Sequence, residues 1–222
     1  MTSRLKRSEL VPTAAVVFAI ALMSVASFAQ SPATISKTVS EVNGSVKGNV
    51  YENTVLGLRI NFPKSMEIDS QEQAEEDLKE AMEFLKKDRK AADQRAIEQL
   101  LARERIVFSI STPEGEDPVG AALNLTIKKV SIDQDLRLMT EKAVDFFSKS
   151  TNFKLEKAIA PDSLGGLQVF SFTLSMDVDG NRIYSRNYAA KRNGYAMTFS
   201  IAYIDEKQLM KMEAVIRGLE TF

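Results

Sequence analysis

The chain has 222 residues, contains neither cysteine nor histidine, and carries a formal net charge of −1. Without cysteine there is no disulfide, no thiol nucleophile and no thiolate metal site. Without histidine a Ser-His-Asp site is excluded, and the commonest zinc ligand is missing. The charge balance shows no basic excess that would attract nucleic acid. The composition therefore predicts no nucleic-acid partner, and no motif in the sequence indicates a cofactor.

The first 29 residues have the layout of a cleavable secretory signal peptide: a charged start, a short apolar run and a small-residue cleavage site. The apolar run over 14–23 is ten residues long. Ser27 and Ala29 fill the two small positions, which places the cut between Ala29 and Gln30. An uncleaved membrane anchor is the alternative, although a span needs roughly 20 apolar residues. The basic residues of the start are Arg4, Lys6 and Arg7.

Cleavage would give an exported, soluble protein with no stable membrane span, either periplasmic or secreted. It would not be a lipoprotein, because the chain has no cysteine to carry the lipid. The removed segment holds three basic residues and one acidic residue, so the remainder has a net charge of −3. Residues 30–47 are rich in Ser and Thr and are predicted to form a flexible leader. A single folded domain is predicted over 48–222.

The clearest helical pattern covers residues 70–103. Ser70 with Gln73 makes a capping-box signature, and a start one residue earlier, at Asp69, is also compatible with the sequence. Apolar residues line one side at helical spacing on both halves of the segment. The charged stretch at 86–90 indicates either one long helix that is solvated there or two helices that join there.

The remaining segments alternate strand-like runs with two further helices. Asp133 is predicted to cap a helix over 134–149, and Asp205 is predicted to cap the last helix. Asp179-Gly180 and Asn193-Gly194 are hairpin turn signals. Because the strands follow hairpin by hairpin, the predicted fold class is α+β, with an antiparallel β-sheet covered by helices. Strands are predicted at 48–54, 56–62, 105–110, 121–130, 153–159, 166–177, 182–190 and 195–203.

One predicted strand carries a stripe of basic and aromatic residues, namely Arg182, Tyr184, Arg186 and Tyr188, which alternate and so share one face. Such a stripe could bind an anionic or planar ligand. It could equally be the solvent face of an antiparallel sheet. The sequence leaves both interpretations open.

Other polar clusters have simpler interpretations. Residues 177–181 suggest a calcium loop, but an EF-hand needs glutamate at its twelfth position, where this chain has Tyr188. Two acid pairs, Glu75 with Glu76 and Asp133 with Asp135, stand at or near predicted helix starts, where carboxylates offset the helix dipole. The sequence therefore predicts no metal site and no catalytic residue.

Several motifs resemble the PsbP-like family and its relatives, the Mog-type Ran-binding and DcrB-type envelope proteins, over residues 48–222. The resemblance implies an antiparallel sheet sandwiched between helices and used as a binding or accessory module. The photosynthetic members are associated with metal binding through histidine, which this chain lacks, and helix 70–103 is longer than the family's usual connection. No functional residue is therefore carried over. The motifs are Val50–Thr54 with Leu56–Pro63, Leu164–Phe170, Asn193–Phe199 and Ile216–Phe222.

These observations predict an exported, non-catalytic accessory or binding protein of the cell envelope that acts through protein–protein contacts. The alternative is a small-molecule or lipid binder with a pocket between the sheet and helix 70–103. A third hypothesis, a carboxylate-based hydrolase, requires a cleft that holds two close acids.

Overall fold

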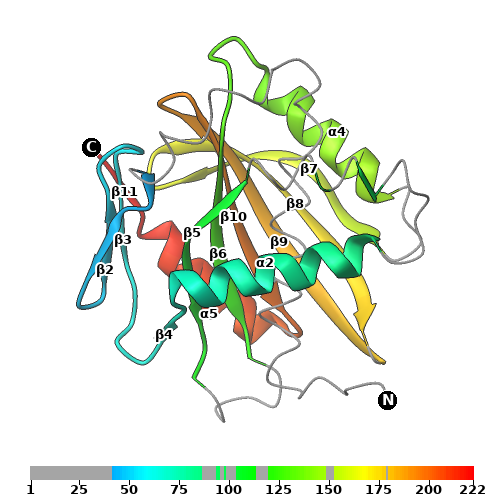
Figure 1. Cartoon of the computed structure of the whole chain (residues 1–222), viewed down its shortest axis with the longest axis horizontal. Coiled ribbons are helices and arrows are strands. Elements are labelled where there is room, and N and C mark those ends of the chain that lie inside the picture. The colour runs from blue at the N-terminus through cyan, green and yellow to red at the C-terminus, as the bar shows by residue number, and fades with distance from the viewer. Residues whose placement is uncertain are drawn as a thin grey trace.

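The computed structural model describes residues 42–86, 94–95, 98, 104–113, 120–148, 153–178 and 180–222. Figure 1 shows their arrangement. The helices are α2 (Gln71–Lys86), α4 (Leu136–Ser148) and α5 (Glu206–Arg217). The strands are β1 (Ser45–Lys47), β2 (Val50–Asn53), β3 (Leu58–Asn61), β4 (Glu67–Ile68), β5 (Arg105–Ser111), β6 (Ala122–Lys129), β7 (Lys154–Leu164), β8 (Leu167–Val178), β9 (Asn181–Arg192), β10 (Tyr195–Tyr203) and β11 (Glu220–Thr221).

The strands form two sheets. The larger has the order β4-β5-β6-β10-β9-β8-β7, and the smaller has the order β1-β2-β3-β11. Neighbouring strands pair antiparallel throughout. The β8–β9 hairpin turns at Gly180, and the β9–β10 hairpin turns at Asn193 and Gly194, all three with positive φ. The predicted α+β class with an antiparallel sheet is confirmed.

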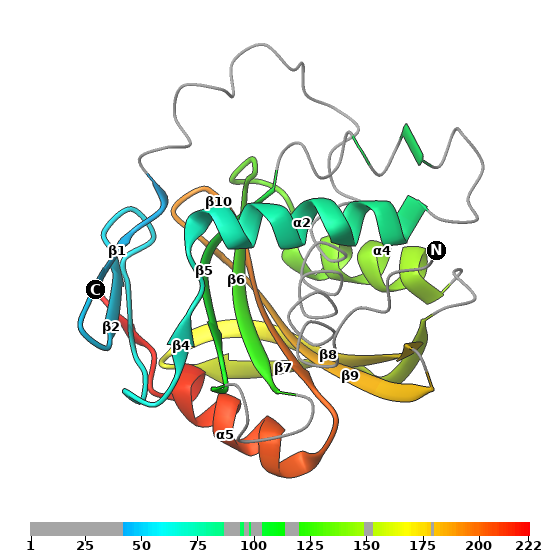
Figure 2. The ribbon, with the colours of Figure 1, turned by 60° about the horizontal axis from the view of Figure 1, so that its bottom comes forward.

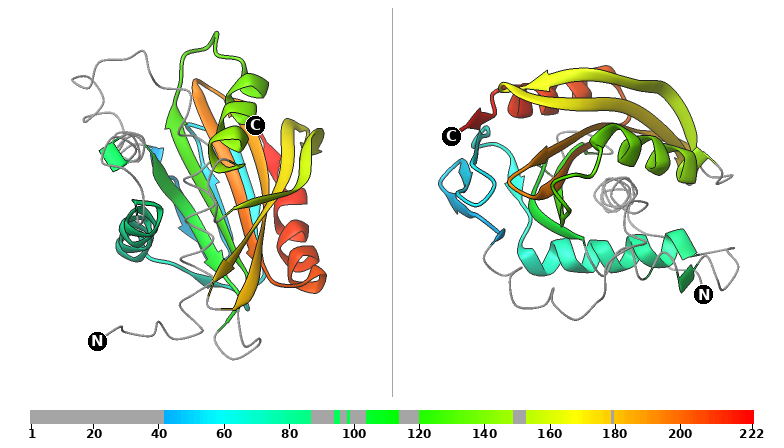
Figure 3. Two further views of the ribbon diagram at one scale, coloured as in Figure 1. Left: turned by 90° about the vertical axis from the view of Figure 1, so that its right-hand side faces the viewer. Right: turned by 90° about the horizontal axis from the view of Figure 1, so that it is seen from above.

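Helices cover both faces of the larger sheet (Figure 3). On one face Leu125, Phe199 and Tyr188 lie opposite one another on adjacent strands, and they share a buried core with the apolar side chains of α5. On the other face Ala196 packs with Met139 of α4, and α2 packs on β5. The result is a helix–sheet–helix sandwich, in which Figure 2 shows α2 and α5 on opposite sides of the strands.

Two of the predicted helix starts are correct and one is displaced. The side chains of Ser70 and Asp205 each accept a hydrogen bond from the backbone N–H three residues later. The prediction that Asp133 caps its helix is wrong, because Asp135 accepts the bond from the first turn of α4, at 3.1 Å. Asp133 instead accepts a hydrogen bond from Ser131. Asp135, two residues after Asp133, is therefore the residue that caps α4.

The folded part of the chain begins earlier than predicted. The flexible leader was expected to run to residue 47, but β1 pairs with β2 over Ser45–Lys47. Val42 is 1 % exposed and lies in the core. Its carbonyl accepts a hydrogen bond from Asn53 Nδ2 at 2.6 Å. This buried hydrogen bond from the Asn53 side chain fixes the chain ahead of β1. The Ser-rich composition of the segment does not indicate such a contact.

Several predictions fall outside the described residues. These include the signal peptide, the cleavage site at Ala29 and Gln30, the leader up to residue 41, and Asp179 of the predicted turn. α2 ends at Lys86, and the continuity of the predicted helix over 87–93 also lies outside them. Within the described ranges, no helix is long and apolar enough to cross a membrane.

Candidate functional site

The predicted stripe on β9 lies beneath α5 for half of its length. Tyr188 has no exposed surface, and the side chain of Arg186 is 17 % exposed. The side chain of Arg182, at the far end of the strand, is 41 % exposed. The interpretation of the stripe as a solvent face is therefore wrong at Tyr188, because the last helix packs over that end of the strand. No local sequence pattern reports where a distant helix will pack.

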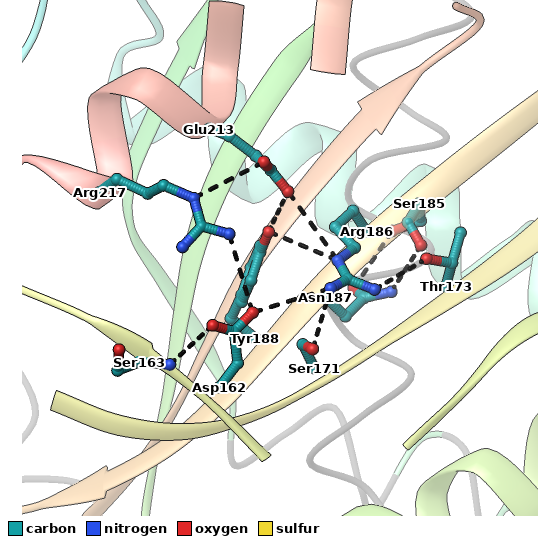
Figure 4. A network of polar contacts seen from close by, with 10 residues as sticks. All are labelled: Asp162, Ser163, Ser171, Thr173, Ser185, Arg186, Asn187, Tyr188, Glu213 and Arg217. Atoms are coloured by element: carbon teal, nitrogen blue, oxygen red, sulfur yellow. Dashed lines mark hydrogen bonds and ion pairs between the residues drawn. The ribbon is translucent and has the colours of Figure 1, made fainter. Parts of the chain in front are cut away.

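Arg186 is the centre of a polar network between β9 and α5 (Figure 4). Its guanidinium lies 5.2 Å from the centre of the Tyr188 ring and within ion-pair distance of Asp162 and Glu213, at 3.8 and 3.9 Å. Arg217 contacts the same two carboxylates. The two arginines and two acids therefore join the β7–β8 hairpin, the sheet and α5.

The Tyr188 hydroxyl completes this network. It donates a hydrogen bond to Glu213 and accepts one from Arg186 Nε at 3.4 Å. Burial, reinforced by the adjacent carboxylate, raises the pKa of Tyr188 well above its ordinary value. The phenol is therefore held protonated as a structural donor and is not a nucleophile or base at neutral pH.

The other two stripe residues also have partners. Arg182 donates to Ser175 and to Glu156, the latter at 2.9 Å. The Tyr184 ring stacks on Tyr203 with ring centroids 5.5 Å apart. A ligand on this stripe would have to compete with these contacts. Ligand binding by Arg182, Tyr184, Arg186 and Tyr188 stays a prediction.

A cavity of about 240 Å³ lies elsewhere, where an edge of each sheet meets the beginning of α2. β1 is the edge strand of the smaller sheet, and β4 is the edge strand of the larger one. The cavity lies between the sheet and the predicted helix 70–103, the place where the alternative hypothesis expected a pocket. Its lining residues are Asn43, Gly44, Ser45, Val46, Tyr51, Ile68, Asp69, Ser70, Ala74, Ile106, Val107, Phe108 and Ser109.

The aromatic part of the lining is fixed. The rings of Tyr51 and Phe108 stack with centroids 4.6 Å apart. The Tyr51 hydroxyl donates to the Asn43 carbonyl at 3.2 Å and accepts from Asn53 Nδ2 at 2.9 Å. Burial raises the pKa of Tyr51 to about 12. This part of the wall is neutral and rigid at physiological pH.

The polar part of the lining offers hydrogen-bond acceptors. Asn43 Oδ1 is buried and has no hydrogen-bond partner among the described residues. Asp69 accepts a hydrogen bond from Ser109, and its carboxylate has further acceptor capacity. Burial raises the pKa of Asp69, an effect that the Ser109 hydrogen bond opposes and Glu67 reinforces. The lining contains no lysine or arginine, so the cavity favours a group that donates hydrogen bonds.

The described residues that line the cavity do not provide the acid pair that a carboxylate-based hydrolase needs. Asp69 is the one acidic residue of the lining. Asp135 serves as a helix cap, and Asp133 is hydrogen-bonded to Ser131 on the exposed surface. Among the described residues, no group of three or more acidic side chains is placed to hold a metal ion. The arrangement at the cavity therefore favours binding over acid–base chemistry.

Sequence reasoning missed Asn43, Tyr51 and Ser109 as site residues and treated Asp69 only as a helix cap. These four side chains come from four separate segments, and only the pairing of β1 with β2 and of β4 with β5 brings them together. The single available signal was the Asn-Gly-Ser turn at 43–45, which interrupts a Ser-rich stretch.

No protein-family model matches this chain, and no curated protein matches it. Solved structures with a similar fold include PsbP from the cyanobacterium Synechocystis, which is 12% identical with a TM-score of 0.47. That match covers 81% of this chain and 98% of the cyanobacterial one.

Two further structures are similar. One, from Bacteroides thetaiotaomicron, is 10% identical with a TM-score of 0.46 and matches 80% of this chain. This chain spans about half of it, 49%. The other is LpqN of Mycobacterium tuberculosis, described as involved in cell envelope biogenesis, which is 10% identical with a TM-score of 0.44. That match covers 73% of this chain and 82% of LpqN. These likenesses concern the fold.

Proposed function

We propose that this protein is an exported, non-catalytic binding protein of the cell envelope that holds an extended segment of a partner protein at the cavity between β1 and β4. The observation that supports this most is the position of the cavity between two strand edges. Val46 on β1 and Ile68 on β4 line it and are 41% and 42% exposed. Exposed apolar side chains at a strand edge are typical of protein-binding sites.

The backbone of β1 can supply the main part of the contact. Its residues, Ser45–Lys47, are exposed, and among the residues that the structure describes they pair on one side only, with β2. An edge strand presents N–H and C=O groups that an added strand can pair with, which gives affinity with little demand on sequence. Alternate side chains of the added strand then enter pockets beside the edge, and those pockets set the specificity.

The cavity fits one partner side chain that ends in a hydrogen-bond donor. Its volume of about 240 Å³ is below the roughly 300–1,000 Å³ of most small-molecule sites. The stem of a lysine would contact the apolar lining, and its ammonium group would donate to Asn43 Oδ1 and Asp69. The partner segment is therefore an extended, mainly apolar peptide with one basic residue.

Fluorescence anisotropy with a labelled heptapeptide, carrying valine at alternate positions and one central lysine, tests this proposal. Ile68→Lys is expected to weaken binding of this peptide at least about tenfold. It removes apolar contact area, and it places a positive charge at the rim of the cavity, where it repels the lysine of the peptide. Ile132→Lys is the matched control, since Ile132 is 84 % exposed and lies outside the cavity. The Ile132→Lys variant should bind the peptide with the same affinity as the unmodified protein.

A second peptide with norleucine in place of lysine tests the role of the acceptors. The unmodified protein is expected to prefer lysine, and Asp69→Asn should remove most of that preference, because a charge-assisted hydrogen bond is lost. Equal weakening by both isoleucine substitutions, or an unmodified protein that binds both peptides alike, would contradict the proposal.

Export is supported by the three-part layout of residues 1–29. The intact mass of the protein recovered from the envelope or medium of its native host is expected to correspond to a chain that begins at Gln30. Ala29→Arg should block cleavage and leave the longer precursor. Recovery of the uncleaved chain from unmodified cells would refute this part of the proposal.

A further inference from the structure

The end of β9 and the turn after it tie three other segments of the chain together. Three successive residues, 191–193, each donate a side-chain hydrogen bond to a main-chain oxygen of a different segment. These segments are the loop between β6 and α4, the turn between β2 and β3, and the residue that follows β11. The pairs are Lys191 Nζ with Ile132 at 2.6 Å, Arg192 Nη2 with Phe222 at 2.8 Å, and Asn193 Nδ2 with Val55 at 2.9 Å.

All three residues that supply these oxygens carry an exposed apolar side chain. Ile132 is 84 % exposed, Phe222 is 58 % exposed and Val55 is 36 % exposed. We call these three side chains the apolar end. Single exposed apolar residues are ordinary, whereas exposed apolar residues that gather at one place indicate an interaction surface. The hydrogen bonds from residues 191–193 hold the three segments, so this surface is formed before anything binds to it.

The main-chain oxygens of the apolar end are prepared for surroundings without water. An exposed turn can leave its carbonyl groups to water, but in lipid every backbone polar group must be satisfied within the protein. Here the oxygens of Val55, Ile132 and Phe222 are already bonded to side-chain donors. Lys191 also donates to the Gln134 carbonyl, at 2.6 Å. Covering the apolar end with an apolar medium therefore breaks none of these hydrogen bonds.

The charges at the apolar end have a positive excess. Lys129, the last residue of β6, is exposed, and Lys191 is bound to carbonyl groups that do not neutralise it. Asp133, beside Ile132, is hydrogen-bonded to Ser131 and interacts with Lys191. Two lysines against one aspartate favour contact with anionic lipid headgroups. Further charged side chains near Phe222 pair with one another, namely Arg59 with Glu52 and Glu220.

We infer that the apolar end is a membrane-contact surface, which places Val55, Ile132 and Phe222 in the interface of a bilayer that contains anionic lipids. The three side chains come from separate segments, and a fluid surface accommodates them without a matching shape. Apolar side chains enter the boundary between headgroups and acyl chains, while nearby lysines stay at the headgroups. Such contact is peripheral and needs no spanning helix. It does not rest on the partner segment proposed above.

A single introduced tryptophan tests this inference, because the chain contains none. The protein that begins at Gln30 is used, since the apolar run over 14–23 would itself bind vesicles. With equimolar phosphatidylglycerol and phosphatidylcholine vesicles, Ile132→Trp is expected to shift its emission to shorter wavelength. Met210→Trp is the control, because Met210 is 63 % exposed on α5, and its emission should not shift. No shift at residue 132, or equal shifts at both positions, would overturn the inference.

Vesicle flotation measures how much each side chain contributes. Ile132→Ser is expected to weaken binding at least about tenfold, because it removes an apolar side chain from the interface. Met210→Ser should leave binding unchanged. Equal weakening by the two serine substitutions would contradict the inference. So would a dimer in sedimentation velocity that Ile132→Ser dissociates, because a second copy of the chain would then cover the apolar end.

The role of charge is tested with a matched pair of lysines. Lys129→Gln is expected to weaken binding to the anionic vesicles about fivefold, the effect of one lysine near such a surface. It should leave binding to pure phosphatidylcholine vesicles unchanged. Lys207→Gln, an exposed lysine on α5, should alter neither. An equal loss for both lysines on the anionic vesicles would show that the apolar end is not the surface that faces the lipid.

Discussion

Gly165→Ala is expected to destabilise the fold by about 3 kcal/mol, from left-handed backbone strain together with overpacking. Gly165 stands in the β7–β8 turn with φ +52. A Cβ there would lie 1.7 Å from the carbonyl oxygen of Leu219, just after α5. No side-chain rotation can relieve an overlap between two backbone segments. The substitution must therefore separate the hairpin from the end of the helix.

The neighbouring glycine provides the control. Gly166 also has positive φ, +81, but a Cβ there would meet nothing within 4 Å. Gly166→Ala is expected to cost only about 1 kcal/mol, the strain of the left-handed backbone alone. Chemical denaturation of both variants measures the difference. Equal losses in the free energy of unfolding would show that the close approach to Leu219 is not a constraint on stability.

Arg186→Met is expected to lower the free energy of unfolding by about 2 kcal/mol, because it removes charged hydrogen bonds from groups that stay buried. Ser171 and Thr173 are 2 % exposed and accept from the guanidinium at 3.0 and 3.3 Å. Of the two arginines that contact them, Asp162 and Glu213 would keep Arg217. The loss should appear in thermal and chemical denaturation alike.

Arg182→Met is the matched control on the same strand. Its ion pair with Glu156 is made by a guanidinium that is 41 % exposed, and such surface pairs contribute about 0–1 kcal/mol. A loss for Arg182→Met as large as that for Arg186→Met would contradict a stabilising role for the polar network that Arg186 makes between β9 and α5.

Local signals in the sequence predicted most of the secondary structure. The caps at Ser70 and Asp205 act within one helical turn, and the alternation along β10 identifies residues of its core face, such as Met197 and Phe199. What failed depends on contacts between distant segments. Tyr188 alternates as a surface residue would, and only the packing of α5 buries it. Val42 is held by a hydrogen bond from Asn53, which lies on β2.

The candidate site was less predictable than the fold for the same reason. Asp69 was identified as a possible helix start, but nothing near it in sequence indicates that Asn43 and Tyr51 line the same cavity. Val46 and Tyr51 both line the cavity, and they stand opposite one another only because of the register of β1 against β2. Strand register is set by many residues at once, so a single segment cannot show it.

Hydrogen exchange with and without the lysine heptapeptide tests the central claim most directly. If the partner segment adds to the edge of the smaller sheet, backbone amides of Ser45–Lys47 should gain protection on binding, together with Ile68. The opposite edge of the larger sheet, β7, should exchange at an unchanged rate. Protection that appears along β7, or none at β1 when the peptide is bound, would contradict the assignment of the β1–β4 cavity as the binding site.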